Sequence, residues 1–248
     1  MTLSFVIPAF NEERYLPDCL RSIQRETAGM ADAVEIIVVN NASTDRTREV
    51  ARSFPGVRVV DEPRKGLPHA RQAGFLASSG DLIANVDADS RLPEGWVAEV
   101  LRSFAADPTL AALSGPLVYY DLSPRERRLV HVFYITAWMT YALNRYILRV
   151  GSMVQGGNFV VERKALERIG GFNLALTFYG EDTDIARRLH EVGRVCFTFN
   201  LKMFSSARRL KKEGILTMAA RYSVNYLWTI FLKRPFTAEH IDIRESEA

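Results

Sequence analysis

The first half of the chain alternates short apolar, β-branched segments with helical patterns, and this alternation constrains the fold more than any other feature. The expected strands are Leu3–Ile7, Val34–Val39, Val57–Val60 and Leu82–Val86. The expected helices are Pro17–Arg25, Asp45–Arg52, Pro68–Ala77 and Glu94–Ala106. Apolar strands separated by helices are typical of a mostly parallel sheet covered on both faces. The sequence therefore predicts an α/β, Rossmann-like fold.

Each of these four strands runs directly into polar sequence. The segments that follow them are, in order, "PAFNEE", "NNASTD", "DEPRKG" and "DADS". Right-handed crossovers place the carboxyl ends of parallel strands at one edge of the sheet, where open α/β sheets bind ligands. We therefore expect the four loops to converge on a single site.

Composition narrows the class of protein. The chain has 248 residues, 48% of them hydrophobic and 25% charged, as expected for a globular domain with at most an appendage. The net charge of +3 is too small to indicate nucleic-acid binding. Cys19 and Cys196 lie far apart in apolar patterns and are typical of buried thiols in a reducing compartment. The N-terminal segment lacks the features of a signal peptide, so we expect a cytoplasmic protein.

The loops after the first two strands carry amides and carboxylates. Neither a Walker motif nor Gly-x-Gly-x-x-Gly is present, which argues against the common phosphate-binding loops. Instead the first loop offers Asn11 and Glu12, and the second offers Asn40 and Asn41. Such side chains suit the edge of a base and the hydroxyls of a ribose. Helix capping by Ser43 or Thr44 is an additional role for the second loop.

The segment "PRKGLPHARQAG" supplies Arg64, Lys65 and Arg71 near the third loop. A cationic loop that leads into a helix is suited to an anion such as a phosphate. Solvated surface charge is the alternative interpretation.

Two aspartates, Asp87 and Asp89, follow the fourth strand. If the strand continued, alternate side chains would share one face and the two like charges would repel each other. An EF-hand is excluded, because Arg91 and Leu92 occupy positions where it needs a ligand and a glycine. A hard divalent ion that also binds a diphosphate needs only one or two protein carboxylates and would relieve the repulsion. Solvated residues that cap a helix near Glu94 are the alternative.

At this point the motifs resemble a known family. Family 2 glycosyltransferases with the GT-A fold contain, in the same order, motifs similar to "SFVIPAFNEERYLPDCLRSI", "VVNNASTDRT", "KGLPHARQAG", "GDLIANVDADSRLPEGW", "QGGNFVVERKALERIGGF" and "GEDTDIARRL". The resemblance covers about Leu3 to Leu189. It implies an inverting transferase that uses a nucleotide-diphospho-sugar and either Mg2+ or Mn2+.

The resemblance also implies roles for individual residues. Asp182 falls at the position of the catalytic base, and Asp87 and Asp89 form the Asp-x-Asp motif that binds the metal. Residues expected to bind the nucleotide-sugar are Pro8, Ala9, Phe10, Asn11, Glu12, Asn40, Asn41, Ser43, Lys65, Arg71, Asp87, Ala88, Arg208 and Arg209. Residues expected near the acceptor are Gly156, Gly157, Asn158 and Glu181. Glu181, Asp182 and Asp184 could instead simply favour a helix start.

Two departures from the family pattern affect these roles. The family often has Asp where Asn40 stands, and an amide can donate as well as accept, which leaves the preferred base open. Many members also carry a late metal-binding His, whereas "FSSARR" fills that region here. Arg208 or Arg209 is then expected to assist the leaving group.

The second half of the sequence predicts a strand at Ala111–Tyr120 and two apolar helices. The first helix covers Leu129–Asn144, and its helical pattern continues to Val150. The second helix covers Met218–Leu232. Thr136, Thr140 and Asn144 form a polar stripe that continues toward Arg145 and Arg149, and basic residues flank both helices. The helices are suited to an anionic membrane surface, which would make the protein peripheral at the inner face of the membrane with a lipid-linked acceptor. Core helices or a homodimer interface are the alternative.

We expect a GT-A domain over residues 1–210 and a helical extension over 211–248. Two other functions stay open from the sequence. One is a glycoside hydrolase that uses Asp89 with Asp182, and the other is a nucleotide-sugar-binding protein without catalysis.

Overall fold

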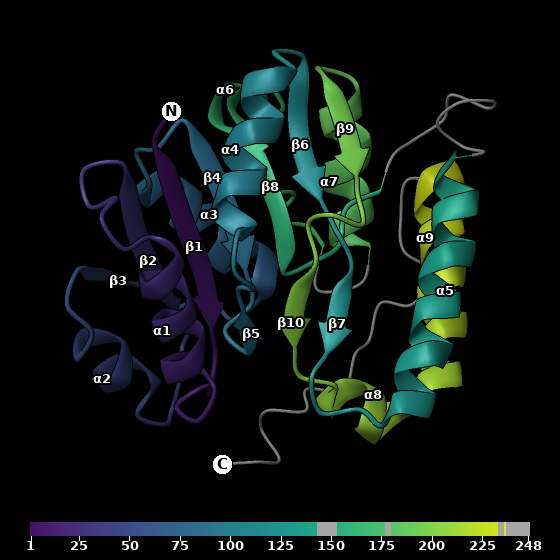
Figure 1. Ribbon diagram of the computed structural model, residues 1–248, viewed down its shortest axis with the longest axis horizontal. Coiled ribbons are helices and arrows are strands. Elements are labelled where there is room, and N and C mark those ends of the chain that lie inside the picture. Colours follow the sequence, from purple (N-terminus) through teal and green to yellow (C-terminus); the bar gives the residue numbers. More distant parts are fainter. Residues whose placement is uncertain (143–152, 177–179, 233–235, 237–248) are drawn as a thin grey trace.

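The computed structural model describes residues 1–142, 153–176, 180–232 and 236, and a seven-stranded sheet forms its centre (Figure 1). Its strands are β1 (Leu3–Ala9), β2 (Val34–Asn40), β3 (Val57–Asp61), β4 (Leu82–Val86), β6 (Leu110–Ser114), β8 (Asn158–Glu162) and β9 (Arg194–Phe197). They are arranged in the order β3-β2-β1-β4-β8-β6-β9. Only β8 runs antiparallel to its neighbours, so the predicted mostly parallel sheet is confirmed.

Helices cover both faces of this sheet. One face packs against α1 (Leu16–Glu26), α2 (Thr47–Arg52) and α4 (Trp96–Ala106), and the other against α3 (Leu67–Ala77), α6 (Arg163–Arg168) and α7 (Glu181–His190). In β1, Phe5 and Ile7 belong to the first core cluster and Val6 to the second. Because successive strand side chains point to opposite faces, one uninterrupted apolar segment supplies both cores.

The predicted strand Ala111–Tyr120 is wrong as a single element. It divides into β6 and β7 (Leu117–Tyr119), which belong to different sheets. Pro116 has no N–H for a central ladder, and a Cβ at Gly115 would overlap the backbone of Leu201. The chain therefore bends at Gly115–Pro116, where another segment packs against it.

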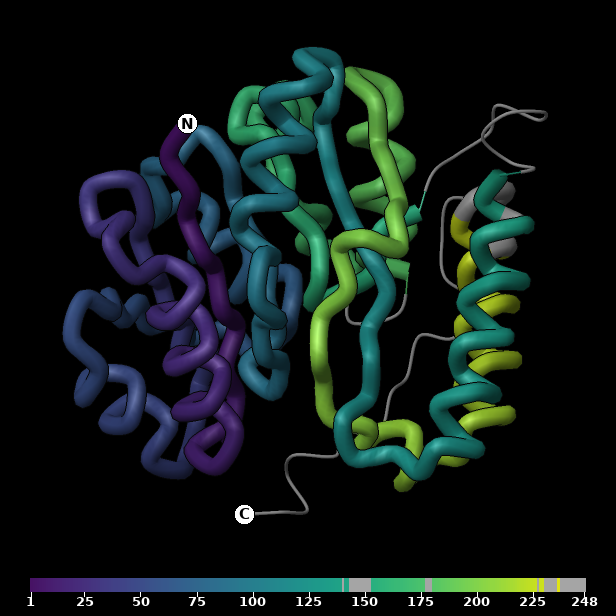
Figure 2. The backbone as a smooth tube through the Cα atoms, in the orientation of Figure 1, coloured from purple at the N-terminus to yellow at the C-terminus, as the bar shows by residue number. Residues whose placement is uncertain are grey.

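A second sheet of three strands forms beside the main one, in the order β5-β10-β7. Here β5 (Ser90–Arg91) pairs antiparallel with β10 (Met203–Ser205), and Ser90 lies opposite Ser205. This register places the residue before β5 close to the residues after β10. Figure 2 shows the chain leaving β10 and entering α8 (Arg208–Glu213) beside the start of α5.

Two long helices, α5 (Pro124–Ala142) and α9 (Ile215–Leu232), contact each other and form one flank of the molecule (Figure 1). They confirm the two predicted helices over the described residues, and the predicted continuation to Val150 lies outside these residues. The predicted domain boundary at residue 210 lies within α8. In the described part of the chain, neither these helices nor any other is long and apolar enough to cross a membrane. The predicted stripe residues Asn144, Arg145 and Arg149 and the C-terminal residues 237–248 lie outside the described residues.

Candidate functional site

The carboxyl ends of β1, β2 and β3 lie in register, so Ala9, Asn40 and Asp61 are neighbours across the sheet. The loops after β1 and β2 are tied together by Asn11, whose Oδ1 accepts a hydrogen bond from the Thr44 backbone N–H at 2.9 Å. The Asn11 N–H in turn donates to Ser43 Oγ at 3.2 Å. The predicted convergence of these loops is thus confirmed, and Asn11 and Ser43 shape it.

Asn40, the last residue of β2, and Asn41, which follows it, make different hydrogen bonds. Asn40 donates from Nδ2 to Asp61 Oδ1 at 2.9 Å, and its Oδ1 is buried and meets no donor in the described part of the chain. Asn41 is fully engaged by the loop after β3. It donates to the carbonyls of Glu62 and Arg64 at 3.0 and 2.8 Å and accepts from the Gly66 N–H at 2.8 Å.

The loop that Asn41 shapes carries Lys65 over the site. Lys65 Nζ lies 4.0 Å from the ring centre of Phe10, a cation–π distance. Both side chains were expected to bind the nucleotide-sugar, and the structure brings them together. Ala9 and Ala88, expected in the same set, are buried residues of the first core cluster.

The two aspartates of "DADS" lie in a turn after β4, and they contact different arginines. β4 ends at Val86, and the Ser90 N–H donates to the Asp87 carbonyl at 2.9 Å to close a turn. Because the strand has ended, alternation no longer applies. Asp87 Oδ1 lies 3.5 Å from Arg71 Nη2, whereas Asp89 Oδ2 accepts from Arg208 Nε at 3.0 Å.

Arg71 is the centre of a buried charge cluster. Its side chain is 1% exposed and forms an ion pair with Glu181, which is 6% exposed, in addition to its contact with Asp87. Its guanidinium lies 5.1 Å from the ring centre of Phe159. The cluster connects α3, the turn after β4 and the start of α7. A buried pair of this kind fixes the relative positions of its elements, since separating it would leave a charge buried alone.

Arg208 forms a second charge cluster at the aspartate turn. It pairs with both Glu12 and Asp89, and its guanidinium lies 4.6 Å from the ring centre of Tyr15. Only 8% of its side chain is exposed. Its neighbour Arg209 pairs instead with Glu213 at 3.1 Å.

Asp182 lies in the first turn of α7 and is half-buried. Burial raises the pKa of its carboxyl above the ordinary value, and a hydrogen bond from the Thr183 N–H at 2.8 Å and the charge of Arg71 offset part of that rise. A carboxylate with a raised pKa is a stronger base than an ordinary aspartate.

Gly156 and Gly157 form a backbone floor between Asp182 and Asp87. A Cβ at Gly156 would lie 3.7 Å from Asp182 Oδ2 and 3.8 Å from Arg71 Nη2, at ordinary contact distances. Gly157 has a φ of 78°, and a Cβ there would overlap the Asp87 carboxylate. The floor thus brings backbone close to the two carboxylates without filling the space between them.

Asn158, which was expected near the acceptor, turns its side chain into the interior. Its Nδ2 donates to the carbonyls of Leu201 at 2.7 Å and Gly115 at 3.0 Å, and its Oδ1 accepts from Trp96 Nε1 at 3.1 Å. These bonds join three separate segments beneath the glycine floor. We therefore assign this side chain a positioning role.

The structure adds residues that the sequence reasoning did not select. Tyr134 of α5 donates its hydroxyl hydrogen to Gln155 Oε1 at 2.9 Å, immediately before the glycine floor. The same hydroxyl accepts from the Leu117 N–H at 3.1 Å. Gln155 and Asp61 stand in segments that the motifs included, but no pattern in the apolar helix singles out Tyr134.

The aspartate turn has the ligands for a divalent ion that a diphosphate shares. Within the described residues, no group of three or more His, Cys, Asp or Glu side chains could enclose a metal. Two carboxylates, Asp87 and Asp89, are nevertheless enough for Mg2+ or Mn2+ when phosphate oxygens and water complete the shell. The Asp87 side chain is 30% exposed, and this donor set therefore fits such an ion.

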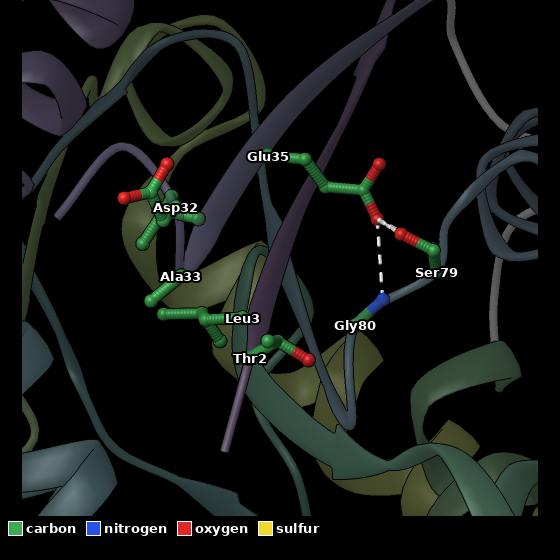
Figure 3. Close-up of a pocket in the computed structure, with 8 residues that line it drawn as sticks. Thr2, Leu3, Asp32, Ala33, Glu35, Ser79 and Gly80 are labelled. Carbon is green, nitrogen blue, oxygen red and sulfur yellow. Dashed lines mark hydrogen bonds between the residues drawn. The ribbon is translucent and has the colours of Figure 1, made fainter.

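A pocket of about 230 Å³ lies at the opposite edge of the sheet, near the amino ends of β1 and β2 (Figure 3). Its central carboxylate, Glu35, accepts from Ser4 Oγ at 2.5 Å, Ser79 Oγ at 3.0 Å and the Gly80 N–H at 3.2 Å. These bonds tie the start of β4 to β1 and β2. We assign this carboxylate a structural role, because its hydrogen bonds serve the fold.

Comparison with known proteins agrees with this geometry. Residues 4–170 match the model of a family described as Glycosyl transferase family 2. The probable glycosyltransferase YdaM of Bacillus subtilis is 27% identical over 222 residues, which is 85% of this chain and 50% of that protein. The hyaluronan synthase of Pasteurella multocida is 32% identical over 86% of this chain and 22% of its own length. The chain thus spans half or less of these curated relatives.

Solved structures show the same fold. A mannosyltransferase from Pyrobaculum calidifontis in complex with GDP-Man and Mn2+ superposes with a TM-score of 0.68 at 24% identity, covering 93% of this chain and 63% of that one. Glucosyl-3-phosphoglycerate synthase from Mycobacterium tuberculosis, with Mn2+ and UDP-glucose, gives a TM-score of 0.60 at 21% identity, covering 92% and 78%. The GT-A fold that the sequence predicted is confirmed.

Proposed function

Because the chain belongs to glycosyl transferase family 2, we propose that it moves a sugar from a nucleotide-diphospho-sugar to an acceptor hydroxyl or phosphate, with inversion at the anomeric carbon. The observation that carries this proposal is the position of Asp182. A carboxylate with a raised pKa lies beside the glycine backbone at Gly156, close to the Arg71–Asp87 cluster. The donors GDP-Man and UDP-glucose bound by two proteins of the same fold support the donor class.

Asp182 is the proposed general base. The oxygen of a hydroxyl acceptor attacks the anomeric carbon and transfers its proton to the Asp182 carboxylate, whereas an ionised phosphate acceptor attacks without a proton to transfer. The bond from that carbon to the diphosphate breaks, and its electron pair leaves with the nucleoside diphosphate. Glu181 is less suited to this role, since its buried carboxylate is engaged in an ion pair with Arg71.

The leaving diphosphate needs positive charge, which the site supplies in two ways. Asp89 and Asp87 would hold Mg2+ or Mn2+, which neutralises phosphate oxygens when bound. Arg208 already lies at this turn, paired with Glu12 and Asp89. We infer that it exchanges these carboxylates for the diphosphate when the donor binds, since all three partners are anions. Arg71 faces the same turn through Asp87.

The nucleoside is proposed to lie over the ends of β1 and β2. Pro8, Ala9 and Phe10 would line its path, and Lys65 above Phe10 would close it. The donor-free Oδ1 of Asn40 would meet the base.

The acceptor is proposed to be lipid-linked and to arrive along α5 and α9. Both helices expose apolar side chains at helical spacing, namely Val132, Ile135 and Met139 on α5 and Leu216, Val224 and Trp228 on α9. Exposed Arg125 and Arg128 occupy the first turns of α5. Apolar stripes with basic ends suit an anionic membrane surface, which would make the chain a peripheral membrane protein. Tyr134 of α5 donates a hydrogen bond to Gln155 beside the glycine floor. A membrane surface along α5 would therefore lie close to the general base, Asp182.

A nucleotide-sugar panel tests the enzymatic proposal. UDP-, GDP- and dTDP-sugars with Mn2+ are titrated while the melting temperature is followed, because a bound ligand raises it by mass action. At least one donor should stabilise the protein, and EDTA should abolish the effect. A chain whose melting temperature no sugar nucleotide changes would not be a transferase of this class.

Asp182→Asn separates catalysis from binding. The variant should bind the donor as well as the unaltered chain, whereas turnover should fall by about 10²- to 10⁴-fold, the usual contribution of a general base. Asp184→Asn is the matched control, because Asp184 pairs with Arg187 and Arg188 on the same helix. Unchanged turnover in Asp182→Asn would show that a group other than Asp182 is the base.

A further inference from the structure

The amide of Asn40 has a fixed orientation in the structure. Its Nδ2 donates to Asp61 Oδ1 at 2.9 Å, and the register of β2 and β3 places the two residues directly beside each other. An ionised carboxylate can only accept hydrogen bonds, so the amide cannot turn its oxygen toward Asp61 without repulsion. The Asn40 oxygen must therefore point elsewhere.

Asp61 is ionised at neutral pH. The hydrogen bond from Asn40 lowers the pKa of its carboxyl, and Arg48, whose Nη2 lies 2.6 Å from Asp61 Oδ2, lowers it further. Arg48 thus holds the carboxylate from one side while Asn40 binds it from the other.

In the described part of the chain, the Asn40 Oδ1 receives no hydrogen bond from the protein. Asn40 is 9% exposed, and no described donor reaches its Oδ1. Leaving a buried carbonyl unsatisfied is costly, so such an atom is expected to receive a donor from a ligand. Asn40 lies at the carboxyl edge of the sheet, beside Ala9 at the end of β1.

We propose that Asp61 fixes Asn40 as a hydrogen-bond acceptor and thereby selects nucleotides whose base carries a ring N–H, namely uracil, thymine or guanine. These bases present a ring N–H beside a carbonyl. Cytosine and adenine present an unprotonated ring nitrogen beside an amino group, and that nitrogen would face the Asn40 oxygen with no hydrogen between them. The second hydrogen of the Asn40 amide is available for the base carbonyl. This inference rests on the proposed function and adds the base class.

The test compares five nucleoside diphosphates by calorimetric titration in Mn2+. Among UDP, dTDP and GDP, the diphosphate that binds best should bind at least about tenfold more tightly than either CDP or ADP. This ratio is expected when one ligand forms a buried hydrogen bond and the other leaves the buried Asn40 oxygen without a donor. In Asp61→Ala the amide can turn and offer Nδ2, and this ratio should fall toward one. Asp61 is 45% exposed and its ion pair contributes little to stability, so this variant should remain folded.

Arg48→Gln is the matched control, because it removes the ion pair and keeps the hydrogen bond between Asp61 and Asn40. Its selectivity ratio should match that of the unaltered chain. Equal binding of all five diphosphates, or an unchanged selectivity ratio in Asp61→Ala, would overturn this inference and leave the proposed function standing. Failure of all five to bind would overturn the proposed function together with it.

Discussion

The carboxyl edge of the sheet and the α5–α9 flank differ in how completely their side chains are satisfied. At the sheet edge, Arg71 and Arg208 each lie between two carboxylates, and the loops are joined by side-chain hydrogen bonds. On the flank, Val132 and Met139 are 57% and 61% exposed. The charged side chains of the sheet edge therefore pair with one another, and in the proposed function they exchange these partners when a ligand binds. The flank has apolar surface that no described segment covers.

The largest effect should follow from breaking the Arg71 cluster. Arg71→Met leaves Glu181 and Asp87 without their cation, and loss of one partner of a buried pair destabilises a protein by about 3–5 kcal/mol. Urea unfolding measures this loss. Arg102→Met, which breaks an exposed pair with Glu99, should change the free energy of unfolding by less than about 0.5 kcal/mol.

A double variant sharpens that result. Arg71→Met combined with Glu181→Gln removes the unpaired buried charge together with the pair. It should be more stable than Arg71→Met alone, which a double-mutant cycle detects as non-additivity. Strictly additive losses would show that the two side chains do not act as a pair.

The next effect concerns Asn158 beneath the glycine floor. Asn158→Ala removes the hydrogen bonds of this side chain and leaves the carbonyls of Gly115 and Leu201 without the donor they have in the unaltered chain. We expect a loss of about 2–3 kcal/mol in the free energy of unfolding, measured by urea titration. Asn200→Ala in an exposed loop is the control and should be nearly neutral. Equal stability of the two variants would contradict the positioning role.

The pH dependence of kcat/KM tests the proposed role of Asp182 as general base at the carboxyl edge of the sheet. The base must be deprotonated, and burial raises its pKa, so activity should fall on the acidic side at a higher pH than for an ordinary aspartate. Arg71 lowers the pKa of Asp182, and Arg71→Gln should therefore move the acidic limb to still higher pH. A shift toward lower pH would contradict this arrangement of charges.

The smallest effect on stability is expected on the flank. Val132→Ser with Met139→Ser should change the free energy of unfolding by no more than about 0.5 kcal/mol, because both side chains are exposed. Co-sedimentation with phosphatidylglycerol vesicles should nevertheless fall by about tenfold or more. Leu76→Ser, at an exposed leucine on α3, is the control and should keep vesicle binding.

Size-exclusion chromatography of the same variants distinguishes the alternative. If the unaltered chain is a dimer that the paired serine substitutions convert to a monomer, and neither form binds vesicles, the flank is an interface between two copies. That outcome would replace the membrane proposal with the homodimer. The Leu76→Ser control should leave the oligomeric state unchanged.

The sequence determined those features that depend on neighbouring residues. β1 to β4 and the helices between them follow from apolar runs, prolines and polar strand ends within a few residues of each other. The family motifs are equally local, so the amino-acid sequence alone was enough to select Asp87, Asp89 and Asp182. The prediction of one strand through Gly115–Pro116 was wrong, because its two halves pair with different strands that lie far along the chain.

The tertiary structure decided which charged groups meet. Arg208 pairs with Asp89 only because β10 lies against β5, and Arg71 meets Glu181 across a separation of 110 residues. The direction of the Asn40 amide likewise depends on Asp61 in the neighbouring strand, 21 residues away. Sequence patterns record backbone preference and burial, which are set locally. The partner of a charge or an amide is set by strand register and helix packing, which bring distant residues within hydrogen-bond distance.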